Sequence, residues 1–370
     1  MTDLHNRKVP ENLVIAVEFL KVLFFVYCFL VSIDLMGIAF KASRDTVQPI
    51  LEHATANPFL GLVLGIVVTS IIQSSSSTTS IVVGLVSGGV LSLQNAIPVI
   101  MGANIGTTVT NTIVSFGYVG RKNEFERAFG ASIVHDMFNI YATMILFPIE
   151  LLTGLIYNTS VGLENVFEKM GGFDFISPLK IIVHPVAGMI SEVVDNHIIV
   201  LVIAFVILFL SLKQIVDNMK GIVMEKIENI LNKYLFRNVL ISLFFGIILT
   251  AIVQSSSVTT SIIIPLVGAG ILTVEQIFPY TLGANIGTTI TAMLAAFTVS
   301  EHKDLAVSVA LAHLIFNVFG ITVIYPIKKI PIWTAKTIAR YVSKSKKHFL
   351  LFLVIYILLH IVPIVFAFFD

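Results

Sequence analysis

Apolar residues run through this chain in long blocks, and two of the blocks carry polar sequences at their centres. Two regions, 59–92 and 240–273, each consist of two apolar arms on either side of a Gln-Ser-Ser-Ser sequence. An arm of about 14–17 residues rises only about 21–25 Å as a helix, whereas the hydrocarbon core of a bilayer is about 30 Å thick. We therefore predict that each region forms a re-entrant helical hairpin, shielded from lipid by protein.

Seven other stretches are long enough for complete membrane spans, since a helical span needs roughly 20 residues. They are 13–40, 95–119, 124–149, 196–213, 276–298, 305–327 and 348–369.

The two polar sequences belong to a repeat. Gln73-Ser74-Ser75-Ser76 and Gln254-Ser255-Ser256-Ser257 are 181 residues apart, and so are two Gly-Ala-Asn-Ile-Gly-Thr-Thr segments that begin at Gly102 and Gly283. Residues 65–110 and 246–291 align without a gap and are identical at 25 of 46 positions. A duplicated polar segment inside apolar sequence is typical of transporters whose binding site lies between two internal repeats.

Each Gly-Ala-Asn-Ile-Gly-Thr-Thr segment falls in the middle of a predicted span, after Pro98 or Pro279. Glycine costs a helix about 1 kcal/mol relative to alanine. We therefore predict a broken transmembrane helix in each repeat, whose freed carbonyls and helix ends face a cavity. Close packing of helices through small residues is the alternative.

Basic residues indicate the orientation of the spans. They concentrate in 120–127, 213–237 and 326–347, which fall on one side and are placed in the cytoplasm, whereas the connection 150–195 is richer in acids and falls outside. Three spans separate the two hairpins, and an odd number inverts the second copy relative to the first. Residues 214–235 and 331–345 are expected to form amphipathic surface helices.

These elements define the predicted fold class, an all-α integral membrane protein with two inverted-topology repeats, each with a re-entrant helical hairpin and a broken transmembrane helix. The predicted domains are the first repeat (1–150), an external connection (151–195), the second repeat (196–330), and an amphipathic segment with a C-terminal span (331–370).

Composition supports an integral membrane protein, which we expect to be a multi-pass protein of the cell (inner) membrane. Hydrophobic residues make up 56% of the chain and charged residues 12%, about half the charged share of soluble domains. The net charge of +1 argues against nucleic acid as a partner, and Cys28, the single cysteine, cannot form an intramolecular disulfide. The chain shows no hydrolase triad, metal-ligand spacing or ATP-binding loop, so we expect no enzymatic activity and no organic cofactor. Uphill transport would then draw on an ion gradient.

The hairpin tips are rich in groups that bind ions. Oxygen donors suit a hard cation, and hydroxyl groups together with helix N-termini suit an oxyanion. Neither tip carries a fixed positive charge, so a bound anion must be neutralised partly by co-bound cations, which couples the two ligands. Polar contacts that merely hold helices together are the alternative.

Asp136 lies within the span 124–149, where an ionised group costs roughly 2.5–3.5 kcal/mol. Its counterpart in the second repeat is Leu314. An acid in one copy alone predicts an extra cation site, and an acid paired with a neighbour such as His135 is the alternative. His135 and His313 occupy equivalent positions, for which a proton relay and a structural role are both open.

Together these motifs resemble those of the type II sodium–phosphate cotransporters. The resemblance is carried by the doubled Gln-Ser-Ser-Ser, the two Gly-Ala-Asn-Ile-Gly-Thr-Thr copies and the stretch Glu124-Phe125-Glu126-Arg127-Ala128-Phe129 … Val134-His135-Asp136, and it covers roughly residues 13–330. It implies sodium-driven import of inorganic phosphate, preferably the divalent form, with sodium, phosphate and the lipid bilayer as partners. Electrogenic members carry an acid at the position of Asp136 and electroneutral ones lack it, so the resemblance implies an electrogenic protein. The short 150–195 connection departs from vertebrate members, and the short chain resembles bacterial ones.

The resemblance also implies which residues bind each ligand. Phosphate contacts would fall on Gln73, Ser74, Ser75, Ser76, Ser255, Ser256, Ser257, Asn104 and Asn285. Sodium ligands would be Gln254, Ser255, Thr288 and Thr291 in the second repeat, and Gln73, Thr107, Thr110, Ser132 and Asp136 in the first. A sodium-coupled symporter for sulfate or a dicarboxylate and a passive anion channel are the competing hypotheses, and a homodimer is left open.

Overall fold

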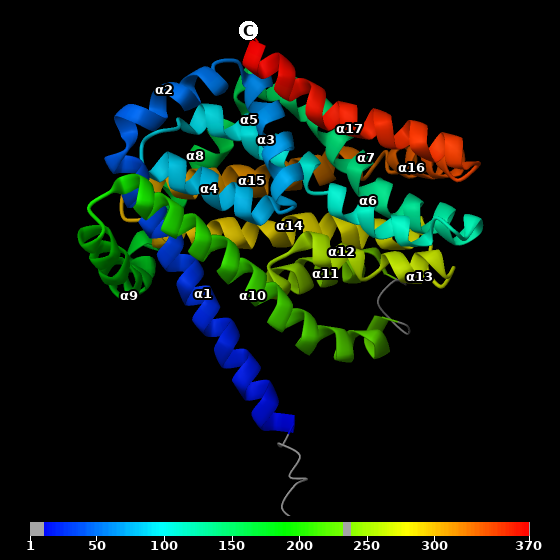
Figure 1. Cartoon of the computed structure of the whole chain (residues 1–370), viewed down its shortest axis with the longest axis horizontal. Coiled ribbons are helices and arrows are strands. Elements are labelled where there is room, and N and C mark those ends of the chain that lie inside the picture. Colours follow the sequence, from blue (N-terminus) through cyan, green and yellow to red (C-terminus); the bar gives the residue numbers. More distant parts are fainter. Residues whose placement is uncertain (1–10, 232–237, 370) are drawn as a thin grey trace, which may run out of the picture.

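The computed structural model describes residues 11–231 and 238–369, and its elements in these ranges are helices (Figure 1). Lys233 and Arg237, which entered the predicted orientation, and the end of the predicted 214–235 segment lie outside the described residues. The helices are α1 (Glu11–Ala42), α2 (Arg44–Ala54), α3 (Pro58–Ile72), α4 (Ser75–Ser87), α5 (Leu93–Gly106), α6 (Val109–Ser115), the 3-10 turn η1 (Phe116–Tyr118), α7 (Lys122–Thr153), α8 (Leu155–Lys169), α9 (Gly172–Val193), α10 (His197–Leu231), α11 (Val239–Val253), α12 (Ser256–Ser261), α13 (Ile264–Gly268), α14 (Val274–Thr298), α15 (Lys303–Ile324), α16 (Lys329–Val342) and α17 (Lys346–Phe369).

Apolar and polar side chains are distributed as in a membrane protein. Large apolar side chains such as Phe19, Ile71 and Leu152 are exposed, whereas many serine, threonine and asparagine side chains are buried. In lipid, apolar groups face outward and polar groups must find their partners inside the protein. The all-α membrane class predicted from the sequence fits this structure.

Five helical segments in the described ranges are long and apolar enough to cross a membrane, and they coincide with five of the predicted spans. They are 16–42, 93–118, 122–153, 197–219 and 303–324. The predicted spans 276–298 and 348–369 form the helices α14 and α17, which are not among these five.

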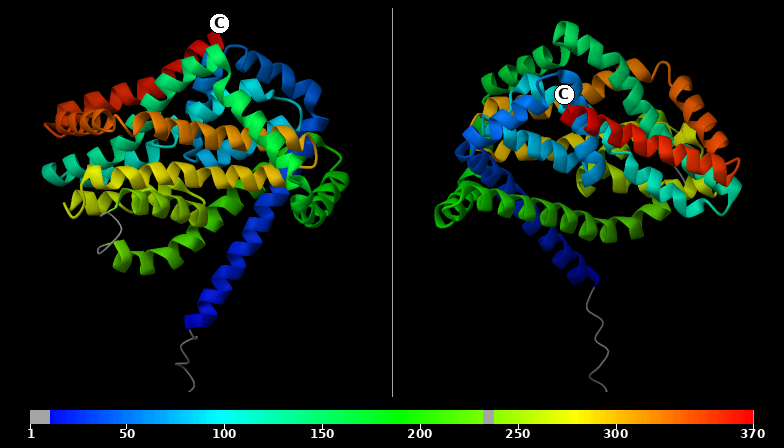
Figure 2. Two further views of the ribbon diagram at one scale, coloured as in Figure 1. Left: turned by 180° about the vertical axis from the view of Figure 1, so that it is seen from behind. Right: turned by 45° about the horizontal axis from the view of Figure 1, so that its top comes forward.

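The long helices pack along one another through the molecule. α14 and α15 lie side by side with α7 packed against both, and α1 packs against α10 and α9. The N-terminal part of α1 extends beyond the helical body in each view (Figures 1 and 2).

Both predicted hairpins form helices that turn back at the Gln-Ser-Ser-Ser sequence. α3 and α11 have 15 residues each, and α4 has 13. The second return arm is divided into α12 and α13, because Pro265 stands where the first arm has Gly84, and proline cannot donate the backbone hydrogen bond of a helix interior. The re-entrant course of these arms through the membrane stays a prediction.

Glycines bring each first arm unusually close to the helix that follows its hairpin. A Cβ atom at Gly102 of α5 would collide with the carbonyl oxygen of Leu62 in α3, and one at Gly283 of α14 would collide with that of Leu243 in α11. Close packing through small residues, the alternative weighed for this motif, therefore accounts for these glycines.

The prediction of a broken helix is wrong for the second repeat. In the first repeat the helix is interrupted at Thr107 and Thr108, between α5 and α6, whereas α14 runs without interruption from Val274 to Thr298. Both copies contain the same seven residues, so the difference arises from their surroundings, which override the weak local preference against helix.

The two predicted amphipathic segments are both helical. The first is continuous with the predicted span 196–213, and together they form one helix, α10, as far as Leu231. The amphipathic helix expected at 331–345 is α16, which packs on α7 and buries the face formed by Ile332, Ala335 and Ala339. The 150–195 connection consists mainly of the helices α8 and α9.

Candidate functional site

Each hairpin tip has the same uncommon backbone conformation. The first arms end at Gln73 and Gln254, which adopt left-handed conformations with φ of 58° and 60°. Few residues other than glycine adopt this conformation, and those that do are frequent at functional sites. Among the described residues, His302 is the one other non-glycine residue with positive φ. The repeat therefore reproduces a strained turn as well as a sequence.

The serine after each glutamine begins the return helix. The hydroxyl oxygen of Ser74 accepts a hydrogen bond from the backbone N–H of Ser77 (3.1 Å), and that of Ser255 accepts one from Val258 (3.3 Å). A serine in this position satisfies one of the free N–H groups of the first helical turn. The following serines, Ser75 and Ser256, are buried in this turn.

The two tips meet at the centre of the molecule. The Ser76 hydroxyl donates to the backbone carbonyl of Gln254 (3.3 Å), and the Ser257 hydroxyl donates to the carbonyl of Thr107 (3.4 Å), at the interruption between α5 and α6. The structure thus brings together the two groups of serines that the sequence predicted to bind phosphate.

The bases of the hairpins lie against different connections. At the end of α4, the backbone carbonyl oxygen of Ser87 lies 3.0 Å from the ring nitrogen Nδ1 of His302, between α14 and α15. After the second hairpin, Gly268 accepts a hydrogen bond from Arg127 at the beginning of α7 (2.9 Å). In Figure 1, α4 lies toward the left of the molecule and α13 toward the right. The hairpins therefore approach their meeting point from different ends.

A buried layer of histidine and asparagine side chains joins the two repeats. Asn285 Oδ1 lies 2.6 Å from His135 Nε2, and Asn285 Nδ2 donates to Asn139 Oδ1 (2.8 Å). The equivalent residues of the other copies also meet, because Asn104 Oδ1 lies 3.4 Å from both His313 Nε2 and Asn317 Nδ2, but here Asn317 donates and Asn104 accepts. Asn104 and Asn285, predicted to contact phosphate, therefore already have partners within the protein.

In the second repeat, two of the predicted sodium ligands are in direct contact. The Thr291 hydroxyl donates to Gln254 Oε1 (2.7 Å), while the Thr288 hydroxyl donates to the carbonyl of Ala284 within its own helix (3.0 Å). With Ser255 at the tip, these side chains supply several oxygen atoms of the kind that sodium prefers.

The equivalent residues of the first repeat are less closely gathered. Gln73 is exposed, and Thr110 Oγ1 is buried without a hydrogen-bond partner. Thr107 and Ser132 donate their hydroxyl hydrogens to carbonyls of their own helices. The two predicted sodium sites thus differ in arrangement.

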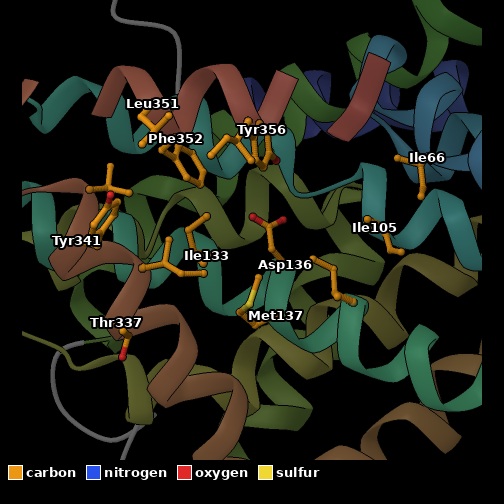
Figure 3. A pocket seen from close by; sticks show the side chains of 14 residues that line it. Ile66, Ile105, Ile133, Asp136, Met137, Thr337, Tyr341, Leu351, Phe352 and Tyr356 are labelled. Carbon is orange, nitrogen blue, oxygen red and sulfur yellow. The ribbon is translucent and has the colours of Figure 1, made fainter. Parts of the chain in front are cut away.

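Asp136 lies in the middle of α7 and is 3% exposed. Its carboxylate points into a cavity that neither hairpin tip lines, and its Oδ2 atom has no hydrogen-bond partner (Figure 3). Thr112 lies beside the carboxyl group. The pairing with His135, weighed as an alternative, does not occur, because the His135 ring contacts Asn285 and Asn111.

Sequence reasoning missed Asn111. Its amide bonds to Thr260 (2.8 Å) and Ser261 (3.0 Å) of the second hairpin and lies 3.3 Å from His135 Nδ1. The signal was available, because the position 181 residues further on is Ala292. Asn111 and Asp136 share this feature, because each is a polar residue that corresponds to an apolar residue in the other repeat.

A second polar cluster involves Asp34, to which the sequence assigned no role. Its buried carboxylate lies 2.8 Å from His184 Nδ1 and accepts a hydrogen bond from Ser300 (2.8 Å). The cluster joins α1, α9 and the connection between α14 and α15. No spacing along the chain predicts it, since its members are 150 and 116 residues apart.

Comparison with known proteins identifies clear relatives. The chain matches the model of the Na+/Pi-cotransporter family over residues 28–171 and 207–329. It is 32% identical over 414 residues to sodium-dependent phosphate transport protein 2A of Rattus norvegicus, covering 90% of this chain and 65% of that protein. It is 30% identical over 434 residues to sodium-dependent phosphate transport protein 2B of Homo sapiens, covering 90% of this chain and 63% of that protein. The chain therefore spans slightly less than two thirds of the length of these relatives. No solved structure matches it significantly.

Proposed function

The chain belongs to the Na+/Pi-cotransporter family, and from this premise we propose that it is a multi-pass symporter of the cell (inner) membrane that couples the import of inorganic phosphate to sodium. The relatives named for sodium-dependent phosphate transport support both ligands. Sulfate or a dicarboxylate is the competing substrate class, and a passive anion channel is the competing mechanism.

The meeting of the two hairpin tips is the observation that carries the proposal. Hydroxyl groups of both repeats converge where Ser76 contacts Gln254 and Ser257 contacts Thr107. In our proposal phosphate binds between these tips, so that its oxygens accept hydrogen bonds from serine hydroxyls. A site formed by elements that enter from different ends can open to either side in turn, as alternating access requires.

The reciprocal contacts of the asparagine layer support an inverted relation between the repeats. Asn285 contacts His135, and the equivalent Asn104 contacts His313. In both pairs the asparagine of one repeat contacts the histidine of the other, and such a reciprocal exchange is the signature of a two-fold relation. In the membrane, an inverted repeat places that axis in the bilayer plane.

Sodium binding and phosphate binding are coupled in this proposal through the tips. Gln254 and Ser255 belong to the second tip, and Thr291 bonds directly to Gln254. A sodium ion held here lies beside the anion and offsets its charge, which neither tip does by itself. Each ligand therefore raises the affinity for the other.

Asp136 provides the further sodium site of the proposal. Its carboxylate would balance the charge of one sodium ion, so that an additional positive charge enters with each phosphate. Inward movement of one net charge gains about 2.3 kcal/mol per 100 mV of membrane potential. The proposed transport cycle is thus electrogenic, with a preference for divalent phosphate.

Uptake of radiolabelled phosphate into proteoliposomes tests this function. Uptake should require an inward sodium gradient and should disappear when choline replaces sodium. Equal uptake with either cation would contradict coupling and favour a channel. Competition by excess sulfate or succinate that abolishes uptake would instead reassign the substrate.

A further inference from the structure

A large apolar cavity lies beside α7, away from the hairpin tips. Its volume is about 720 Å³, and its walls come from α3, α5, α7, α16 and α17. Figure 3 shows Leu351, Phe352 and Tyr356 of α17 covering one side, with Ile133 and Met137 of α7 opposite. A volume of this size is typical of sites for small organic molecules.

One charged residue lies among the lining side chains. Asp136 is 3% exposed, its carboxylate is aimed into the cavity, and Oδ2 has no hydrogen-bond partner. The other polar lining residues are Thr337, Tyr341 and Tyr356. A buried carboxylate is stable when an opposite charge with hydrogen-bond donors pairs with it. The chemistry of the walls therefore calls for an apolar body that carries a cationic group.

We propose that this cavity binds an amphiphilic amine, whose ammonium group pairs with Asp136 and whose apolar body fills the space between α7, α16 and α17. Binding of such an amine does not require the proposed transport function, although the additional sodium ion of that proposal would use the same carboxylate. An ammonium group can donate up to three hydrogen bonds, which matches an acceptor without a partner.

The position of Asp136 favours a free amine over a membrane phospholipid. The residue lies in the middle of the 32-residue helix α7, roughly 20 Å of helix or more from either end. The headgroup of an amine-bearing phospholipid would have to leave the membrane interface and take its phosphate into apolar walls. Burying an unpaired phosphate is far more costly than burying an alkyl chain.

Equilibrium binding of dodecylamine to the purified protein in nanodiscs tests the proposal, with empty nanodiscs subtracted. Dodecanol and dodecanoate serve as neutral and anionic probes of the same chain length. We expect saturable binding of one dodecylamine per chain, with an affinity about tenfold or more higher than that of dodecanol. A tenfold difference in affinity corresponds to about 1.4 kcal/mol. Equal affinity for the amine and the alcohol in the wild-type protein would overturn the proposal.

Two substitutions separate the charge from the cavity. Asp136→Asn should abolish the preference for the amine over the alcohol, and Ile338→Trp, which fills the cavity from α16, should weaken the binding of both. Leu152→Trp adds the same side chain at a residue that is 85% exposed and should leave binding unchanged. An amine preference that survives Asp136→Asn would contradict the assignment of the carboxylate.

Sodium titration distinguishes this inference from the transport proposal. If sodium also uses Asp136, increasing sodium should lower the apparent affinity for dodecylamine but not for dodecanol. Amine binding that requires Asp136 yet ignores sodium would support the amine site and contradict the additional sodium site. Binding does not require transport, so failed phosphate uptake leaves this test intact.

Discussion

At the scale of single residues, the two repeats share hydroxyl and amide groups but differ in charge. Equivalent positions of the two repeats hold the same residue in the serines of both tips, in Asn104 and Asn285, and in His135 and His313. Asp136, in contrast, corresponds to Leu314. The paired residues lie at the contact between the copies. Asp136 lies apart from them, in the cavity beside α16 and α17. This separation suits a role in charge balance better than direct contact with phosphate.

The substitution Asp136→Gly should leave phosphate transport measurable and remove its voltage dependence. Without the carboxylate, the proposed additional sodium ion has no charged ligand, so each cycle moves one positive charge fewer. Phosphate-induced current and radiolabelled uptake, measured on the same proteoliposomes, check the result. A mutant that retains the current for the same uptake would show that the acid is structural.

Thr291 and Thr110 form a matched pair at equivalent positions of the two repeats. Thr291→Val removes a hydroxyl that bonds to Gln254, so we expect the apparent sodium constant to rise roughly 2- to 10-fold, the equivalent of about 0.5–1.5 kcal/mol for one hydrogen bond. Thr110→Val removes a buried hydroxyl without a partner, so folding stability should not fall. A rise in the apparent sodium constant of Thr110→Val would then indicate that the Thr110 hydroxyl binds sodium.

Sodium activation curves of phosphate uptake, together with thermal unfolding, measure both effects. Wild-type sodium constants in both variants would exclude these threonines from the sodium sites. A large loss of stability in Thr291→Val would instead assign its bond to folding alone.

At the scale of elements, the repeat predicted helix boundaries well but could not distinguish two uses of glycine. The arms, the tips and α7 lie where the apolar pattern placed them. The glycines that suggested two broken helices allow α3 to approach α5 and α11 to approach α14, and of these two helices only the one in the first repeat is interrupted. A repeated glycine in the sequence indicates a backbone position that tolerates no side chain. Whether the cause is a break in the helix or a close neighbouring helix can be seen only in the folded structure. The same limit hid the cluster of Asp34, His184 and Ser300, whose members meet only in the folded chain.

Adding one methyl group at either packing glycine should destabilise the protein strongly. In Gly102→Ala and Gly283→Ala the new Cβ meets a backbone carbonyl of the neighbouring arm, which moves only if the whole arm shifts. We expect each to cost about 1–3 kcal/mol or more. Gly162→Ala in α8 is the control, because no atom lies within 4 Å of its added Cβ and alanine favours helix by about 0.5–1 kcal/mol.

Thermal unfolding in detergent, followed by size-exclusion chromatography, compares the three variants. The two packing variants should lose the monodisperse peak at lower temperature than the wild type, and Gly162→Ala should retain it at least as well. Wild-type stability of Gly102→Ala or Gly283→Ala would contradict the close approach of the helices.

At the scale of the whole molecule, reciprocal contacts relate the two repeats. The base of the first hairpin lies against the connection before α15, and that of the second lies against the beginning of α7. α7 begins at Lys122 and α15 at Lys303, and they are corresponding helices of the two repeats, because His135 of α7 corresponds to His313 of α15. If the repeats are inverted in the membrane, the beginnings of these two helices lie on opposite sides.

Cysteine accessibility tests this inversion with one pair of residues. Asn123 and Asp304 are exposed residues near the beginnings of α7 and α15, and Cys28 is the only native cysteine. In a Cys28→Ala background, Asn123→Cys should react with a membrane-impermeant maleimide only in inside-out vesicles, since the basic residues around 120–127 favour the cytoplasm. Asp304→Cys should react in intact cells. Reaction of both on the same side would exclude inverted topology, and the two hairpins would then enter from one face. That arrangement leaves no second pathway to the meeting point of the tips, so alternating access as proposed requires the two cysteines to react from opposite sides.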